Sequence, residues 1–483
     1  MKKFSKVVLL VLATLVAFAS IACAVSCGPE PYTKQPTQYL QCKGWEPNTK
    51  KVINQMFDAF GRNNVNYNPE CRPYAVFDCD NTISLTDVQE QLFIYQIEWL
   101  RFALKPEEIY AAITADVPDL DKVWDYEGVK GSVSDFAKDV ADAYAKLYKK
   151  GYVAPDASKA SLHSKWMKDP DWAEFAAKLR FMYDLIGDNY SVSVSYPWAG
   201  YWFAGMTPAQ AEQVAYESHM YYTALGKKNP KNWTKAKWQS PDNYKSRVGK
   251  VSVGFRVCTG VSDEMRELIK KLDANGIDVW INSASPVSTI RGLLRAWKLE
   301  GVKDIVAMTY QMKDGKYLAA YDYDLHAQTQ GVGKAETIVK SIAPLYNNHG
   351  PIFGAGDSQG DFNFMTEFKD TVCGIIINRQ RKDDAGLCAA IAMYQNEKGI
   401  DLYKAMKAGE IRFVLQGRQE NGGFFWAKPD TQLVGKDKVF ALHEKAEKWL
   451  ASLKSGETTP NKLLNDCTNL TGKLKEYVGT KTR

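Results

Sequence analysis

Asp78 and Asp80 are the residues best suited to chemistry in this sequence. They directly follow the short apolar run 74–77, within Asp78-Cys79-Asp80-Asn81-Thr82. Two carboxylates two residues apart point the same way where extended geometry persists. One can attack phosphorus, and the other can protonate the leaving oxygen and later activate water. Taken alone, the pair is more typical of an ordinary acidic strand-to-loop turn.

Ser283 and Lys334 lie further along the chain. Ser283 ends the apolar run 278–282, and its hydroxyl can hydrogen-bond a phosphoryl oxygen. The alternative for this segment is a helix cap near Pro286, a role that Ser285 can fill. Lys334, in Gly-Val-Gly-Lys, can offset negative charge in a transition state, although a lone lysine is usually a solvated surface group. The flanking glycines do not form a nucleotide P-loop.

Asp357 and Asp361 form the last polar group, in Gly-Asp-Ser-Gln-Gly-Asp after the apolar run 351–356. Carboxylate oxygens are hard ligands that suit Mg²⁺. The alternative is an acidic turn, because the segment is rich in turn-forming residues.

The elements around these residues alternate between apolar strand-like runs and amphipathic helical segments. This alternation predicts an open, mostly parallel α/β sheet, in which ligands gather at the carboxyl ends of the strands. A hairpin is expected within 305–324. Strands are predicted near 74–77, 276–281, 351–356 and 373–377, and helices near 49–62, 263–274, 286–297, 335–342 and 437–453.

In this order, the four polar groups resemble the four motifs of the haloacid dehalogenase (HAD) superfamily. The resemblance implies a Rossmannoid parallel sheet with helices on both faces. It also implies phosphatase activity, because HAD dehalogenases lack a residue equivalent to Asp80. The implied roles are nucleophile for Asp78, acid/base for Asp80, charge bridging for Lys334 and phosphoryl binding for Thr82 and Ser283. The implied Mg²⁺ ligands are Asp78, the backbone carbonyl of Asp80, Asp357 and Asp361.

About 195 residues separate Thr82 from the strand expected at Asp278, far more than a crossover needs. Such an insert resembles a helical cap that closes over the site, which favours a small phosphomonoester over a polymer. The predicted organisation is a signal peptide at 1–27, a linker at 28–45, a core at 46–82 and 251–430, a helical cap at 83–250 and a C-terminal helical extension at 431–483.

The runs 74–82, 196–198, 203–207 and 276–280 resemble exported bacterial phosphorylcholine phosphatases. Cys79, in a variable slot that is often Met, and the spacing of the last motif depart from that family. A quaternary ammonium favours a carboxylate and aromatic faces. Glu90 matches an acidic position of the family, and Asp87 is the second choice. An aromatic wall is expected from Tyr196, Trp198, Tyr201, Trp202 and Phe203, although such clusters are more often core.

The N-terminus carries Lys2, Lys3 and Lys6 before an apolar stretch that is short for a membrane span, which indicates a secretion signal. Cleavage can follow Ala24, or Cys23 or Cys27 can become the lipid-bearing first residue. We therefore expect an exported protein, periplasmic or anchored to the cell envelope by lipid only. Losing the three lysines lowers the formal net charge from +6 to about +3, which gives no reason to expect nucleic acid binding.

Two other functions stay open on the sequence alone. One is a phosphoserine-type or broad small-molecule phosphatase, and the other is a lipoprotein that binds choline-type ligands without turnover. The cysteines form no zinc pattern, although Cys42 and Cys71 can pair in an exported protein. The oligomeric state does not follow from the sequence.

Overall fold

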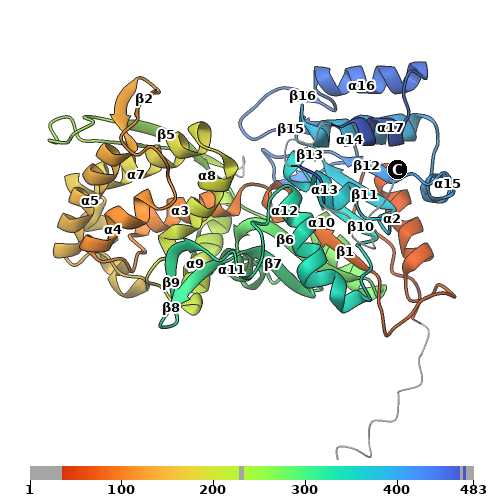
Figure 1. Cartoon of the computed structure of the whole chain (residues 1–483), viewed down its shortest axis with the longest axis horizontal. Helices are drawn as coiled ribbons and strands as arrows, with labels where there is room; N and C mark the ends of the chain where they lie inside the picture. The colour runs from red at the N-terminus through yellow and green to blue at the C-terminus, as the bar shows by residue number, and fades with distance from the viewer. Residues whose placement is uncertain (1–34, 228–232, 468–471, 475–483) are drawn as a thin grey trace, which may run out of the picture. The chain divides into compact units, whose positions relative to one another are not determined.

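The computed structural model describes residues 35–227, 233–467 and 472–474 (Figure 1). The chain divides into two compact units, residues 1–37 and residues 38–483. All helices and strands named below belong to the second unit. The predicted signal peptide, with the candidate lipid sites Cys23 and Cys27, lies outside the described residues. Within the described ranges, no helix combines the length and the apolar character needed to cross a bilayer.

A six-stranded, fully parallel sheet forms the centre of the second unit. Its order is β12-β11-β10-β1-β6-β7, so the strand order reverses between β1 and β10, where ligands bind in doubly wound folds. This confirms the predicted fold class. The strands are β1 (Tyr74–Phe77), β6 (Asp278–Pro286), β7 (Asp304–Met308), β10 (Phe353–Gly356), β11 (Cys373–Ile377) and β12 (Arg412–Gln416).

Helices cover both faces of this sheet, because alternate strand residues point to opposite sides. Ala75 and Phe77 pack with α2 (Pro47–Phe60), α10 (Asp263–Ala274) and α11 (Val287–Trp297). Tyr74 and Val76 instead belong to the cluster that holds three helices of the other face. These are α12 (Val332–Thr337), α13 (Phe362–Thr366) and α14 (Asp384–Glu397).

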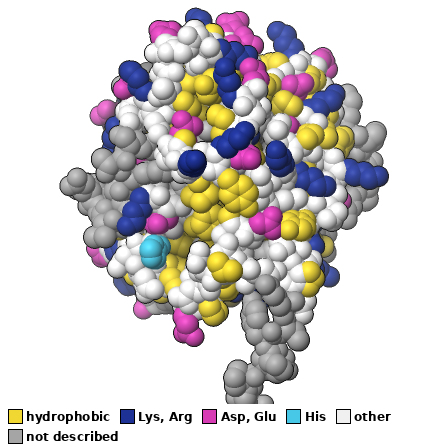
Figure 2. Space-filling view, turned by 90° about the vertical axis from the view of Figure 1, so that its right-hand side faces the viewer, with side chains coloured by type: hydrophobic (Ala, Val, Ile, Leu, Met, Phe, Trp, Pro, Cys, Tyr) yellow, Lys and Arg dark blue, Asp and Glu magenta, His cyan; other side chains and the backbone are white. Residues whose placement is uncertain are grey.

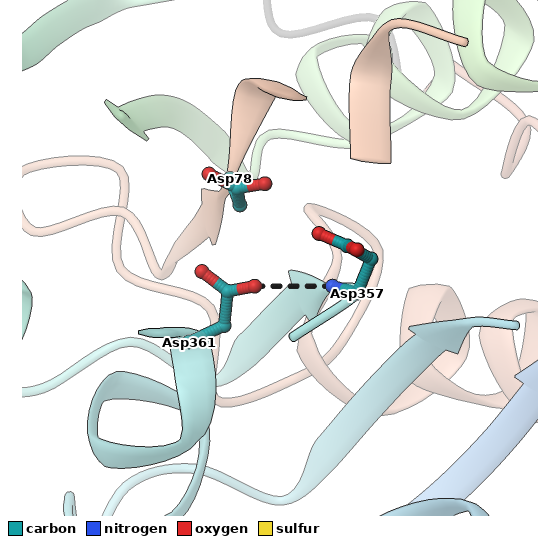
Figure 3. Close-up of side chains that lie close together, drawn as sticks. All are labelled: Asp78, Asp357 and Asp361. Atoms are coloured by element: carbon teal, nitrogen blue, oxygen red, sulfur yellow. Dashed lines mark hydrogen bonds between the residues drawn. The ribbon is translucent and has the colours of Figure 1, made fainter. Parts of the chain in front are cut away.

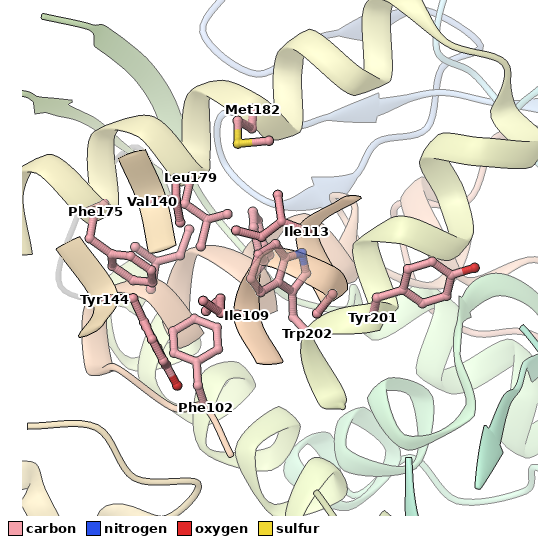
Figure 4. Packing of buried hydrophobic residues seen from close by; sticks show 14 of the residues in the cluster. Phe102, Ile109, Ile113, Val140, Tyr144, Phe175, Leu179, Met182, Tyr201 and Trp202 are labelled. Carbon is pink, nitrogen blue, oxygen red and sulfur yellow. The ribbon is translucent and has the colours of Figure 1, made fainter. Parts of the chain in front are cut away.

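The insert after β1 is mostly helical, as expected, and has a hydrophobic core of its own (Figure 4). Phe102 packs edge-on against Tyr144, Phe175 and Trp202 in this core. Its elements are α3 (Val88–Trp99), α4 (Pro106–Thr114), β2 (Val123–Tyr126), β3 (Val129–Ser132), α5 (Val133–Lys149), α6 (His163–Trp166), α7 (Pro170–Asn189), α8 (Val192–Gly200), α9 (Pro208–Lys227), β4 (Thr234–Gln239) and β5 (Ser252–Val257).

The return from the insert to the sheet lies later than the predicted boundary at residue 250. β5 pairs antiparallel with β4, and its inward residues Val253 and Phe255 join the core of the insert. The hairpin of β8 (Tyr310–Lys313) and β9 (Lys316–Tyr321) also packs against this core. Backbone hydrogen bonds of 2.9 Å join Tyr317 to residues 205 and 206 of the insert. The insert is therefore locked to the sheet domain at several places.

The predicted linker is wrong for its described part beyond residue 37. Residues 38–45 pack on the domain, because Leu40 and Trp45 are buried and Trp45 Nε1 donates to Glu267 at 2.9 Å. Cys42 and Cys71 both carry free thiols in the described part of the chain, so the two are not bonded to each other.

The C-terminal part begins with a small sheet instead of helix, so the predicted helix start at residue 437 is wrong. His443 accepts from the Lys445 N–H and caps α16 (Glu444–Ser455). Figure 2 shows one face of the molecule, with Lys and Arg scattered between acidic and apolar side chains. The remaining elements are α15 (Leu402–Lys407), β13 (Arg418–Gln419), β14 (Phe424–Phe425), β15 (Thr431–Gln432), β16 (Val439–Phe440) and α17 (Pro460–Asp466).

Candidate active site

Three buried aspartates meet where β1 and β10 end (Figure 3). The Asp78 N–H donates to Ala355 O at 2.9 Å and extends the pairing of the two strands by one residue. Carboxylate oxygens of Asp78, Asp357 and Asp361 lie within 4.8 Å of one another. Asp361 Oδ2 also accepts from the Asp357 N–H at 3.0 Å, which holds the last motif in a tight turn. The predicted metal-binding side chains are thus brought together.

Lys334 lies in the same cluster and is only 2% exposed, so it is not the solvated surface lysine of the alternative interpretation. Its Nζ donates to Asp78 Oδ1 at 2.6 Å and to Asp361 Oδ1 at 2.7 Å. The backbone explains why glycine occupies two positions just before Lys334. Gly331 has φ of 54°, and a Cβ on Gly333 would lie 2.0 Å from Gln328 O.

Asp80 is held from both sides. Its Oδ1 accepts from the Val88 N–H at 2.7 Å, and its Oδ2 accepts from Ser285 Oγ at 2.7 Å and from Ser283 Oγ at 3.4 Å. Ser285 lines the adjacent cavity and Ser283 does not. The nearer hydroxyl therefore belongs to the residue that the sequence pattern favoured only as a helix cap. No side-chain hydrogen bond caps α11.

Thr82 is not placed where a phosphoryl-binding residue should lie. Its side chain is buried and does not line the cavity, and Oγ1 has no hydrogen-bond partner among the described residues. The chain turns sharply at Asn81, which adopts φ of 60° and lines the cavity in its place.

Burial dominates the electrostatics of the site. It raises the pKa of Asp80 to about 7, with the charge of Asp87 adding and the hydrogen bond from Ser285 opposing. It raises the pKa of Asp357 to about 6, although Arg379 opposes the shift. It also raises the pKa of Asp78, together with Asp361 and against Lys334.

Three carboxylates and one ammonium leave a buried excess of negative charge when all are ionised. This donor set fits a divalent cation, because hard oxygen ligands suit Mg²⁺ and the ion offsets the excess charge.

A cavity of about 310 Å³ opens above the cluster, in the size range of small-molecule sites. Asp78, Asp80, Lys334, Asp357 and Asp361 line it from the sheet domain. The insert contributes Asp87, Gln89, Tyr183, Val192, Ser195, Tyr196 and Trp198. Sequence reasoning missed Tyr183, which lies on α7 more than 100 residues beyond Asp78, and Arg381, which follows β11.

The predicted substrate residues separate into two groups. Asp87, Tyr196 and Trp198 line the cavity, whereas Glu90 and Trp202 do not. Glu90 Oε1 lies 2.5 Å from Arg180 Nη2, so its charge is already paired. Trp202 is buried in the core of the insert, where Figure 4 shows it among apolar side chains. Tyr201 and Phe203 are likewise buried away from the cavity.

No protein-family model matches the chain, and no curated protein matches it. Among solved structures, a conserved functionally unknown protein from Anaerococcus prevotii DSM 20548 is similar at 25% identity and a TM-score of 0.66, over 82% of this chain and 99% of that chain. A HAD family hydrolase from Salmonella enterica serovar Typhi matches at 9% identity and a TM-score of 0.28, over 63% of this chain and 62% of that one.

A phosphoserine phosphatase with a phospho-aspartyl intermediate analogue matches at 12% identity and a TM-score of 0.26, over 63% and 86%. TM-scores this low allow no comparison of sites. The fold is thus shared, over most of both chains, with the Anaerococcus protein.

Proposed function

We propose that this protein is a Mg²⁺-dependent phosphomonoester hydrolase of the HAD superfamily that acts through an aspartyl-phosphate on Asp78. One observation carries the proposal: Asp78 lies buried between Lys334 Nζ at 2.6 Å and the carboxylates of Asp357 and Asp361, at the carboxyl end of a parallel sheet. A buried ammonium beside a carboxylate nucleophile can hold that carboxylate in place and balance the charge of an incoming phosphoryl group.

In the first step, an Asp78 carboxylate oxygen attacks phosphorus and the bond to the ester oxygen breaks. The leaving alcohol takes its proton from the Asp80 carboxyl, whose pKa of about 7 keeps part of the population protonated near neutral pH. In the second step, the Asp80 carboxylate accepts a proton from water. That water attacks the phosphorus of the aspartyl-phosphate, which releases inorganic phosphate and restores Asp78.

Asp78, Asp357 and Asp361 would hold Mg²⁺ through their side chains, and the HAD resemblance adds the backbone carbonyl of Asp80. When bound, the ion supplies charge neutralisation for the phosphoryl oxygens. Lys334 Nζ donates hydrogen bonds to the carboxylates of Asp78 and Asp361 and so fixes the position of both. Ser285 holds the carboxyl of Asp80 toward the cavity.

The substrate that we propose is a small, cationic, phosphorylcholine-like ester in an exported compartment. The size of the cavity supports a small ester, and the carboxylate of Asp87 with Tyr183, Tyr196 and Trp198 supports a cationic group. Asp87 replaces Glu90 in this role, because Glu90 is paired with Arg180. Export, with an N-terminal lipid anchor at Cys23 or Cys27, stays part of the proposal on the basis of the first 27 residues.

A second candidate is a phosphoserine-type phosphatase. Arg381 favours it, because this cation lines the same cavity as Lys334 and can pair with the carboxylate of an amino-acid ester. Arg381 Nε is 2.9 Å from Asp383, so an anionic substrate would compete with that carboxylate.

A substrate panel tests the proposal. The purified mature protein is assayed with and without Mg²⁺ on phosphorylcholine, phosphoethanolamine, phosphoserine and a chromogenic phosphate ester. We expect Mg²⁺-dependent phosphate release with the highest kcat/KM on phosphorylcholine. A preference for phosphoserine would select the second candidate. Ligand binding by calorimetry without phosphate release from any ester would leave a non-catalytic binding lipoprotein and overturn the enzyme proposal.

A further inference from the structure

The loop that carries both reactive aspartates is wound in an unusual way. Residues 79–83 form a single wide turn, with Asn81 in the left-handed region at φ of 60°. Such a conformation costs free energy for a residue with a side chain, so surrounding contacts must hold it. On the amide side, the Asn81 N–H donates to Thr86 O and to Ser84 Oγ, both at 3.3 Å.

Arg418 holds the other side of this loop. Its Nη1 donates to Asn81 O at 2.8 Å and to Ser84 O at 3.3 Å, and its Nη2 reaches Leu85 O at 3.5 Å. The guanidinium is fully buried and comes from β13, more than 330 residues later in the chain. A planar fork with several donors suits a set of carbonyls that point in different directions.

Glu420 makes the burial of this cation tolerable. Its Oε1 accepts from Arg418 Nε at 2.9 Å and from Nη2 at 2.7 Å, and its Oε2 accepts from the Val434 N–H at 2.8 Å. Arg379 adds a second cation at 3.3 Å. A buried ion pair is costly to desolvate and contributes little to stability compared with apolar packing. Because the Arg418–Glu420 pair lies against carbonyls of the loop that follows Asp78, its role is to hold the conformation of that loop.

We propose that Arg418, held by Glu420, is a positioning residue that fixes the loop between Asp78 and Val88. The proposal rests on the proposed function, since it assigns the loop its importance for turnover. The peptide between Asp80 and Asn81 is trans, so its N–H and C=O point in opposite directions. With the N–H bound to Ser84 and Thr86 and the next carbonyl bound to Arg418, the orientation of the Asp80 peptide is determined on both sides.

The test compares Arg418→Met with Arg412→Met. Arg412 is an equally buried arginine on β12 that donates to Ile400 O at 2.7 Å and does not touch the loop. We expect Arg418→Met to lower kcat about 100-fold with little change in KM, because small misplacement of reacting groups has effects of that order. Arg412→Met should keep kcat within about threefold, while both variants lose thermal stability.

Hydrogen–deuterium exchange provides a readout that does not need activity. The peptide covering residues 78–88 should exchange faster in Arg418→Met than in Arg412→Met, with other core peptides equally protected. If Arg418→Met does not fold, Arg418→Lys serves instead, since it keeps a cation beside Glu420 but loses the fork. If the wild-type protein hydrolyses none of the esters and the loop still exchanges faster in Arg418→Met, the positioning role is upheld and the proposed function is refuted. Unchanged loop exchange and unchanged kcat would overturn the positioning role.

Discussion

One cavity is lined on one side by residues at the carboxyl ends of the central strands, called the edge below, and on the other side by residues of the insert, called the wall. The two regions differ in how their side chains reach the cavity. At the edge, Asp78 and Asp357 follow directly from strand ends, and Lys334 comes from the first turn of α12. On the wall, Asp87, Tyr183 and Tyr196 come from three different helical segments whose neighbours mostly face the insert's own core. In the proposed enzyme, the reacting groups thus lie on the parallel sheet, while the groups that would select the substrate depend on packing within the insert.

Replacement of a buried lysine tests this difference most strongly, because the sheet domain and the insert each contain one among the residues that the structure describes. Lys334 pairs with Asp78 and Asp361, and Lys178 in the insert pairs with Asp139 at 2.6 Å and with Glu174. Replacing either lysine with methionine should cost about 3–5 kcal/mol of stability, because buried carboxylates lose their partner. Only Lys334→Met should also lower kcat, by about 1,000-fold.

Denaturant unfolding and steady-state kinetics on the two variants check this prediction. Equal losses of kcat in both variants would mean that the insert's ion pair supports catalysis as much as the edge does, which would remove the distinction between the two regions.

The wall can be tested by neutralising one carboxylate at a time. Asp87→Asn should raise the KM for phosphorylcholine about tenfold, because a cation loses its carboxylate partner in a partly desolvated site. Its KM for a chromogenic phosphate ester whose leaving group carries no cation should change much less. Glu90→Gln is the matched control, since Glu90 lies one helical turn away but is paired with Arg180.

A larger effect on the KM for phosphorylcholine from Glu90→Gln than from Asp87→Asn would restore the assignment that the family resemblance favoured. It would also mean that the ion pair with Arg180 opens on substrate binding.

The smallest expected effect is the pH dependence of stability at the edge. Burial raises the pKa of Asp80 from 3.8 to about 7 and that of Asp357 to about 6, so the folded protein binds more protons than the unfolded chain in this window. Stability contributed by these groups is present below 3.8 and is lost as pH rises toward 7. Without metal, we expect the Tm to fall by a few degrees across that window.

Added Mg²⁺ should offset this loss at pH 8, because a ligand that binds only the folded state raises the Tm. Thermal melts with EDTA or with Mg²⁺ check both parts. Asp357→Asn should flatten the pH slope and remove the response to Mg²⁺. A metal response that survives in this variant would place the ion elsewhere.

The edge could be predicted from the sequence for a physical reason. Apolar runs mark buried parallel strands, and their carboxyl ends must meet along one line, so acids at those ends must lie together. This reasoning located Asp78, Asp357 and Asp361. It missed Ser285, because β6 continues to Pro286 with an irregular register after Ser283, and Ala284 and Ser285 line the cavity instead of Ser283.

The wall was predicted less well. Trp198 lines the cavity and Trp202, four residues later, is buried in the insert, because the chain leaves α8 for a short 3₁₀ turn between them. The pairing of Glu90 with Arg180 joins residues 90 positions apart and leaves no local pattern. The two-residue strands β13 to β16, which carry Arg418, are too short to show a period.

Trapping the phosphorylated enzyme tests the central claim most directly. The wild-type protein is mixed with Mg²⁺ and a substrate labelled in its phosphoryl group, quenched with acid during turnover, and analysed by peptide mass spectrometry after borohydride reduction. Because borohydride converts the acyl-phosphate to an alcohol and releases the labelled phosphate, the account predicts protein-bound label before reduction, a side-chain alcohol at Asp78 alone after reduction, and neither in Asp78→Asn. Phosphate release by Asp78→Asn at the wild-type rate, or label on another residue, would contradict it.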